Sequence, residues 1–240
     1  MSYPYKAVVF DWAYTLVDLV REDDRAAFQK VFALLRAHEV PVPDFEVWFG
    51  AYRNLFRGMI DLSRQTHREA NFEQVLRWLL IRFAVPIEGK VSFRELVELF
   101  YGEYHSCRRV YPEVPSTLQR LQSMNVRMGV ISNTTNPSFI KEAERKASGL
   151  DSYFDFALYS SDLPYRKPHP SIFELALARL QYEPAEVLFV GDQPRMDILG
   201  AQGVGMRAAW INRRGDALPD GVKPDYTFTT LDGLLEIHVG

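Results

Sequence analysis

The chain has 240 residues, is 47% hydrophobic and carries a formal net charge of −3. This size suits one buried core, with or without a small accessory domain, and the charge offers no basic surface to nucleic acid or anionic lipid. The lone cysteine, Cys107, excludes an intramolecular disulfide, and no window approaches the ~20 apolar residues of a membrane span, so we expect a cytoplasmic protein without nucleic-acid or membrane partners.

The N-terminal part of the chain combines one strand with a long helical segment. The apolar run at residues 7–10 ends in Asp11 and predicts a buried strand. Between residues 20 and 107 the apolar side chains recur at helical spacing. Breaks fall at residues 41–43, 70–71 and 86–90, which separates the apolar positions into four groups. We therefore expect a four-helix insert.

After Pro112 the pattern changes to alternating strands and helices. Short apolar runs at 126–131, 156–159, 187–190, 208–211 and 226–228 have the length of buried parallel strands. Helical segments are expected at 114–123, 137–148, 170–180 and 194–202, and the segment 231–237 continues the alternation. The sequence thus predicts an α/β fold, a doubly wound parallel-sheet core of residues 1–18 and 109–240. An all-helical cap domain of residues 19–108 interrupts it.

Polar motifs follow several of the predicted strands. Because ligands bind beyond the carboxyl ends of strands in open α/β sheets, these motifs are expected to meet at one edge of the sheet. Each motif alone is a weak signal, since Ser-Asn is common in turns and Lys-Pro is common at helix starts. In chain order they are Asp11, Ser132-Asn133, Lys167-Pro168 and Gly191-Asp192 with Asp197 five residues further on.

Taken together, the order of these motifs resembles the haloacid dehalogenase (HAD) superfamily, and the resemblance covers essentially the whole chain. The phosphatases of that family begin with Asp-x-Asp-Gly-Thr, whereas this chain reads Asp-Trp-Ala-Tyr-Thr at residues 11–15. Ala13 thus stands where a second Asp is usual, and Tyr14 where a Gly is usual. A tyrosine would be strained if the backbone there takes positive φ.

The resemblance implies a nucleophile, a phosphate site and a metal site. The Asp11 carboxylate would attack phosphorus and form an aspartyl phosphate, which needs no activating base. A Mg²⁺ ion would offset the repulsion between the two anions. The implied metal residues are Asp11, Ala13 through its carbonyl, Asp192 and Asp197, the last also as a residue that orients Lys167. The implied phosphate-binding residues are Thr15, Ser132, Asn133 and Lys167, and the catalytic ones are Asp11 and Lys167.

Ala13 keeps other functions open. In the phosphatases the second Asp protonates the leaving group, which is typically worth ~10²–10⁴-fold in rate. The leading hypothesis is a Mg²⁺-dependent hydrolase of a small phosphorylated metabolite. The first motif also partly resembles phosphonoacetaldehyde hydrolase, and 2-haloacid dehalogenases likewise lack the second Asp, so a C–P or C–halogen hydrolase is an alternative. A non-catalytic binding protein on a HAD fold is another. The sequence specifies neither the substrate nor the oligomeric state.

Overall fold

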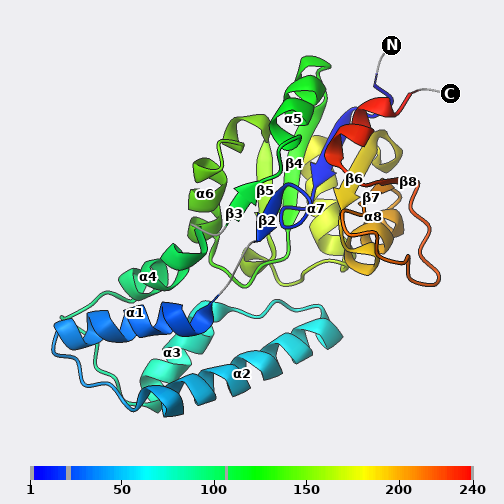
Figure 1. The fold of residues 1–240 in the computed structure, drawn as a ribbon. Helices are drawn as coiled ribbons and strands as arrows, with labels where there is room; N and C mark the ends of the chain where they lie inside the picture. Colours follow the sequence, from blue (N-terminus) through cyan, green and yellow to red (C-terminus); the bar gives the residue numbers. More distant parts are fainter. Residues whose placement is uncertain (1–2, 20–22, 106–107, 239–240) are drawn as a thin grey trace.

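A six-stranded parallel sheet forms the centre of the molecule. The computed structural model describes residues 3–19, 23–105 and 108–238, so Cys107 lies outside the described residues. The strand order is β5-β4-β1-β6-β7-β8, and all pairings in this sheet are parallel. This confirms the predicted doubly wound α/β core (Figure 1). The strands are β1 (Ala7–Phe10), β4 (Arg127–Ser132), β5 (Phe156–Tyr159), β6 (Val187–Gly191), β7 (Arg207–Ile211) and β8 (Tyr226–Phe228).

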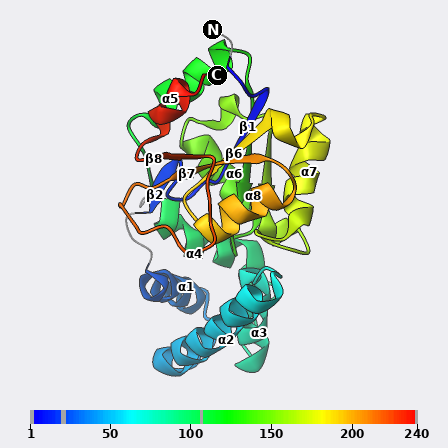
Figure 2. The same cartoon turned by 90° about the vertical axis from the view of Figure 1, so that its right-hand side faces the viewer.

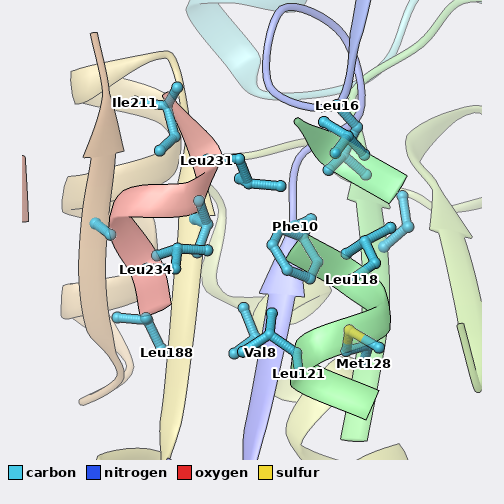
Figure 3. Close-up of a cluster of buried hydrophobic side chains, with 14 of the residues drawn as sticks. Val8, Phe10, Leu16, Leu118, Leu121, Met128, Leu188, Ile211, Leu231 and Leu234 are labelled. Atoms are coloured by element: carbon cyan, nitrogen blue, oxygen red, sulfur yellow. The ribbon is translucent and has the colours of Figure 1, made fainter. Parts of the chain in front are cut away.

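The two faces of the sheet are covered by different helices. Because successive strand residues point to opposite faces, Val8 and Phe10 of β1 pack in one apolar cluster and Val9 in another. The first cluster includes α5 (Val114–Ser123) and the 3₁₀ helix η5 (Leu231–Glu236), whose leucines close over β1 in Figure 3. The second includes α7 (Pro170–Leu180) and α8 (Leu199–Gly203). The sheet is therefore buried on both sides.

Four helices form a separate layer beside the carboxyl edge of the sheet (Figures 1 and 2). They are α1 (Asp24–Ala37), α2 (Phe45–Thr66), α3 (Phe72–Arg82) and α4 (Phe93–His105). Asp44 and Asn71 cap the N-termini of α2 and α3 by accepting backbone N–H bonds. The helices share an apolar cluster that also contains Ile140 of α6 (Ser138–Ala147). None of the described helices is apolar over a stretch long enough to cross a membrane.

A two-stranded ribbon joins the helical layer to the sheet. β2 (Val17–Leu19) precedes α1, and β3 (Arg108–Val110) follows α4. The two strands are antiparallel, with Leu19 opposite Arg108 and Val17 opposite Val110. Both chain connections between core and cap thus run side by side.

Candidate active site

Three carboxylates meet at the carboxyl ends of β1 and β6. Asp11 follows β1, Asp192 follows β6, and Asp197 lies in the wide π-helical turn η4 (Pro194–Ile198). One carboxylate oxygen from each lies within 4.8 Å of the other two. Since β1 and β6 are adjacent and parallel, their ends reach the same edge of the sheet. The structure therefore brings these predicted site residues together.

Lys167 is the cation at the centre of this cluster. Its Nζ lies 2.6 Å from Asp11 Oδ1 and 2.7 Å from Asp197 Oδ1. It also donates a hydrogen bond to the Ile131 carbonyl at 3.1 Å, and the residue is 1% exposed. A buried ammonium in contact with two carboxylates is well compensated. When all three carboxylates are ionised, they and this one lysine leave two negative charges, which is the charge that one divalent cation offsets.

The side chain of Asn133 holds the lysine loop in place. Its Nδ2 donates to the Lys167 carbonyl at 3.0 Å, and its Oδ1 accepts the Lys167 N–H at 2.8 Å. Ser132, the last residue of β4, is buried next to it. The Asn133 side chain of the Ser-Asn motif thus positions the backbone of Lys167.

Gly191 allows Asp197 to approach the end of β6. A Cβ atom at residue 191 would lie 2.3 Å from Asp197 Oδ2, so only glycine fits. The same carboxylate oxygen accepts the Gln193 N–H at 2.9 Å. These contacts explain why a glycine precedes Asp192 and why a second Asp follows at residue 197.

Two of the three carboxylates, those of Asp192 and Asp197, have raised pKa values. Burial, together with the charges of Asp11 and Asp197, raises the pKa of Asp192 to about 8. Burial also raises the pKa of Asp197, to about 6, although Lys167 opposes this. For Lys167, burial lowers the pKa, but Asp11 and Asp197 outweigh it and hold the pKa above its usual value. The lysine stays charged while the acids repel one another, an arrangement that favours cation binding.

The loop after Asp11 takes a left-handed turn at Tyr14. Its φ is 60°, a conformation that costs a non-glycine residue roughly 1–2 kcal/mol. Arg213 stabilises the loop, because it donates to the Tyr14 carbonyl at 3.2 Å and to the Thr15 carbonyl at 2.8 Å. Arg213 in turn pairs with Glu113 at 2.7 Å. Tyr14 thus has the positive φ at which a tyrosine is expected to be strained. Its neighbour Thr15 is fully buried.

A pocket of about 290 Å³ opens beside the carboxylate cluster. Ala13, Ser132 and Asn133 line it from the core, and Ile60 and Arg64 of α2 line it from the cap. Arg108 and Lys141 also line this pocket, and the sequence motifs did not indicate a role for either of them. The helical cap thus contributes to the surface that a ligand of this site would touch.

Comparisons with known proteins find similarity along most of the chain. A family model described as haloacid dehalogenase-like hydrolase matches residues 5–205. Glyceraldehyde 3-phosphate phosphatase of Pyrococcus furiosus is 31% identical over 236 residues, which is 97% of this chain and 92% of that protein. Among solved structures, 2-haloacid dehalogenase from Pseudomonas syringae pv. Tomato DC3000 is 30% identical with a TM-score of 0.71, covering 97% of both chains. A HAD phosphatase from Thermococcus onnurineus is 27% identical with a TM-score of 0.67, covering 96% of both.

Proposed function

Because the chain belongs to the haloacid dehalogenase-like hydrolase family, we propose that it is a Mg²⁺-dependent cytoplasmic phosphatase that hydrolyses a small phosphorylated compound through an aspartyl phosphate on Asp11. The observation that carries the proposal is the contact of Lys167 Nζ with Asp11 and Asp197, at 2.6 and 2.7 Å, within a cluster of three carboxylates. The similarity to a phosphatase of Pyrococcus furiosus supports it.

The carboxylate cluster fits a magnesium ion. Mg²⁺ takes oxygen ligands and is commonly held by one or two protein carboxylates together with substrate phosphate. Asp11, Asp192 and the Ala13 carbonyl would hold the ion, with Asp197 as the third carboxylate of the cluster. When bound, the ion would neutralise negative charge on the phosphoryl group as it meets the carboxylate.

In the proposed reaction, an Asp11 oxygen attacks phosphorus and the ester P–O bond breaks. The leaving alkoxide takes a proton from water, because Ala13 offers no acid. Water then attacks the phosphorus of the aspartyl phosphate, which releases inorganic phosphate and restores Asp11. Lys167 orients the carboxylate, and Thr15, Ser132 and Asn133 are the proposed partners of the phosphoryl oxygens.

Metal removal tests the proposal. Chelation with EDTA is expected to abolish hydrolysis of p-nitrophenyl phosphate, and added Mg²⁺ to restore it. Asp192→Asn should raise the Mg²⁺ concentration for half-maximal rate by at least about tenfold, since it removes a charged ligand. Asp220→Asn, at an exposed carboxylate, is the matched control and should leave that concentration unchanged. Full activity in EDTA would refute the metal site.

A dehalogenase is the second candidate, favoured by the similar solved structure from Pseudomonas syringae and by Ala13. There the same carboxylate would attack carbon and displace halide. Halide release from 2-chloropropionate in EDTA, by a protein that does not hydrolyse p-nitrophenyl phosphate, would replace the phosphatase proposal with this one.

Restoring an acid at position 13 should increase turnover of alkyl phosphates. Ala13 lines the pocket beside Ser132, and a positioned general acid is worth ~10²–10⁴-fold. We expect Ala13→Asp to raise kcat/KM for an alkyl phosphate by about tenfold, less than a well-positioned general acid contributes. The gain is small because the positive charges of Lys167 and Mg²⁺ lower the pKa of the new carboxyl group, which must be protonated to act as an acid. An aryl phosphate should gain less, since a phenolate leaves without a proton.

The measurement compares kcat/KM of a matched alkyl and aryl phosphate in wild type and Ala13→Asp. Ala13→Asn is the control, because it adds a side chain of the same shape that cannot donate a carboxyl proton. A fall for both substrates in Ala13→Asp, with Mg²⁺ affinity intact, would show that residue 13 does not face the leaving group.

A further inference from the structure

Lys141 is a buried acid–base group that the proposed reaction does not use. It lies on α6 and is 4% exposed. Its Nζ lies 2.9 Å from Glu144 Oε2 on the same helix and 5.7 Å from the centre of the ring of Trp12, the residue that follows Asp11. The side chain is therefore held beside the nucleophile loop and away from solvent.

Lys141 also reaches the pocket at the proposed active site. It lines the same 290 Å³ pocket as Ala13 and Ser132, and it is close enough to Asp11 for the two charges to interact. A phosphate ester with its phosphorus beside Asp11 would place its leaving group in this pocket. Lys141 is thus one of the residues that the leaving group would meet.

The other side chains of this pocket are poor proton donors. Among the described residues that line it, the one carboxyl group belongs to Glu69 and the one amino group to Lys141, and the other charged side chains are arginines, which keep their protons. Glu69 accepts hydrogen bonds from Ser160 Oγ at 2.6 Å and from Arg166 Nη1 at 3.2 Å. These bonds favour the ionised carboxylate, which has no proton to give. Lys141 is therefore the donor that remains.

The surroundings of Lys141 bring its pKa toward neutral pH. Burial, together with the charge of Arg108 on β3, lowers the pKa of the lysine to about 8, although Glu144 on α6 and Asp11 on the nucleophile loop act in the opposite direction. A general acid works best when its pKa lies near the operating pH. The other charged side chains among the described residues of the pocket wall are Arg64, Glu69 and Arg166.

Building on the phosphatase function proposed above, we propose that Lys141 is the general acid and base that stands in for the carboxyl group missing at Ala13. As Asp11 attacks phosphorus and the ester P–O bond breaks, the Lys141 ammonium gives a proton to the leaving oxygen, which departs as an alcohol. The neutral amine then takes a proton from the water that attacks the aspartyl phosphate. This restores the ammonium, frees the Asp11 carboxylate and releases inorganic phosphate, so Lys141 replaces water as the source of the proton.

The test compares cyclohexyl phosphate, whose alkoxide needs a proton to leave, with p-nitrophenyl phosphate, whose phenolate does not. Lys141→Met should lower kcat/KM for cyclohexyl phosphate by about a hundredfold, the lower end of what a general acid contributes, and for p-nitrophenyl phosphate by less than about threefold. Lys141→Arg should show the same selective loss, because a guanidinium keeps the charge but does not give up its proton.

The pH profile separates acid catalysis from a structural role. In the wild type, kcat/KM for cyclohexyl phosphate should fall as the pH rises through about 8, because the lysine then loses the proton that it must donate. Bound Mg²⁺ would move this fall to lower pH, since it adds positive charge nearby. The fall should be absent from the remaining activity of Lys141→Arg. Lys146→Met, the matched control at an exposed lysine of α6, should keep both the rates and the profile.

Three results would overturn the acid role of Lys141. One is an equal loss for both substrates in Lys141→Met, which would indicate a structural role. Another is full turnover of cyclohexyl phosphate by Lys141→Arg, which would show that the site needs only the charge. The third is a wild type that hydrolyses p-nitrophenyl phosphate but not cyclohexyl phosphate, since no acid then serves the leaving group.

An NMR titration keeps the inference separate from the proposed function. In protein labelled with ¹³C at the lysine Cε atoms, the signal that is absent from Lys141→Met belongs to Lys141 and should titrate near pH 8. A pKa at the ordinary lysine value of about 10.4 would overturn the acid role even if p-nitrophenyl phosphate is hydrolysed. Absent hydrolysis of every phosphate would overturn the phosphatase proposal, and the titration would still decide whether Lys141 can act as an acid.

Discussion

Asp11→Asn is expected to lower kcat for p-nitrophenyl phosphate by about 10⁴-fold or more, the scale of loss when a covalent nucleophile is removed. The amide has nearly the same shape but cannot attack phosphorus as a carboxylate does. Acid quenching of the wild type during turnover of ³²P-labelled substrate should trap label on the protein. The bond should be cleaved by hydroxylamine, as an acyl phosphate is, and the variant should trap none.

Asp232→Asn, an equivalent change at an exposed carboxylate, should keep wild-type activity and labelling. If Asp11→Asn and wild type hydrolyse the substrate at equal rates, the measured activity does not come from this site. Ligand binding without turnover in the wild type would instead favour the non-catalytic binding protein.

Removing the central cation should destabilise the protein. Lys167→Met leaves the buried carboxylates of Asp11 and Asp197 facing each other, 2.6 and 2.7 Å from where the ammonium stood. Breaking a buried ion pair by deleting one partner costs about 3–5 kcal/mol. We expect a fall of that size in the free energy of unfolding, measured by urea denaturation in EDTA, together with loss of activity. Mg²⁺ should restore part of the stability, because it offsets the same carboxylates.

The control is Lys223→Met, which removes an exposed lysine of the core and should shift stability by less than about 0.5 kcal/mol. Unchanged stability of Lys167→Met in EDTA would mean that the lysine does not compensate the two acids.

The regular elements could be predicted closely where two signals coincide. The helix expected at residues 170–180 is α7, because Pro170 is favoured at a helix start and the apolar spacing continues to Leu180. The strand expected at 156–159 is β5. The segment 194–202 is less regular than expected, since it begins as the π-helical turn η4 before α8.

Features that depend on tertiary contacts could not be predicted. Strands β2 and β3 have three residues each and form only because the cap returns the chain beside its point of departure. A Lys and a Glu three residues apart on a helix usually mark an exposed face, so Lys141 and Glu144 gave no sign of burial. The meeting of the motif residues was predictable because the strand ends of a parallel sheet share one edge. The support that Arg213 gives to the loop after Asp11 was not predictable.

The β2–β3 ribbon also has a consequence for how this chain can change in evolution. Leu19 and Arg108 are paired, so the ends of the inserted segment are held together by hydrogen bonds that do not involve the cap helices. The entropy of closing a loop between fixed ends grows slowly, by about 0.6 kcal/mol for each doubling of its length. The sheet can therefore accommodate inserted segments of very different length at this point of the chain, while the carboxylates at the ends of β1 and β6 stay in place.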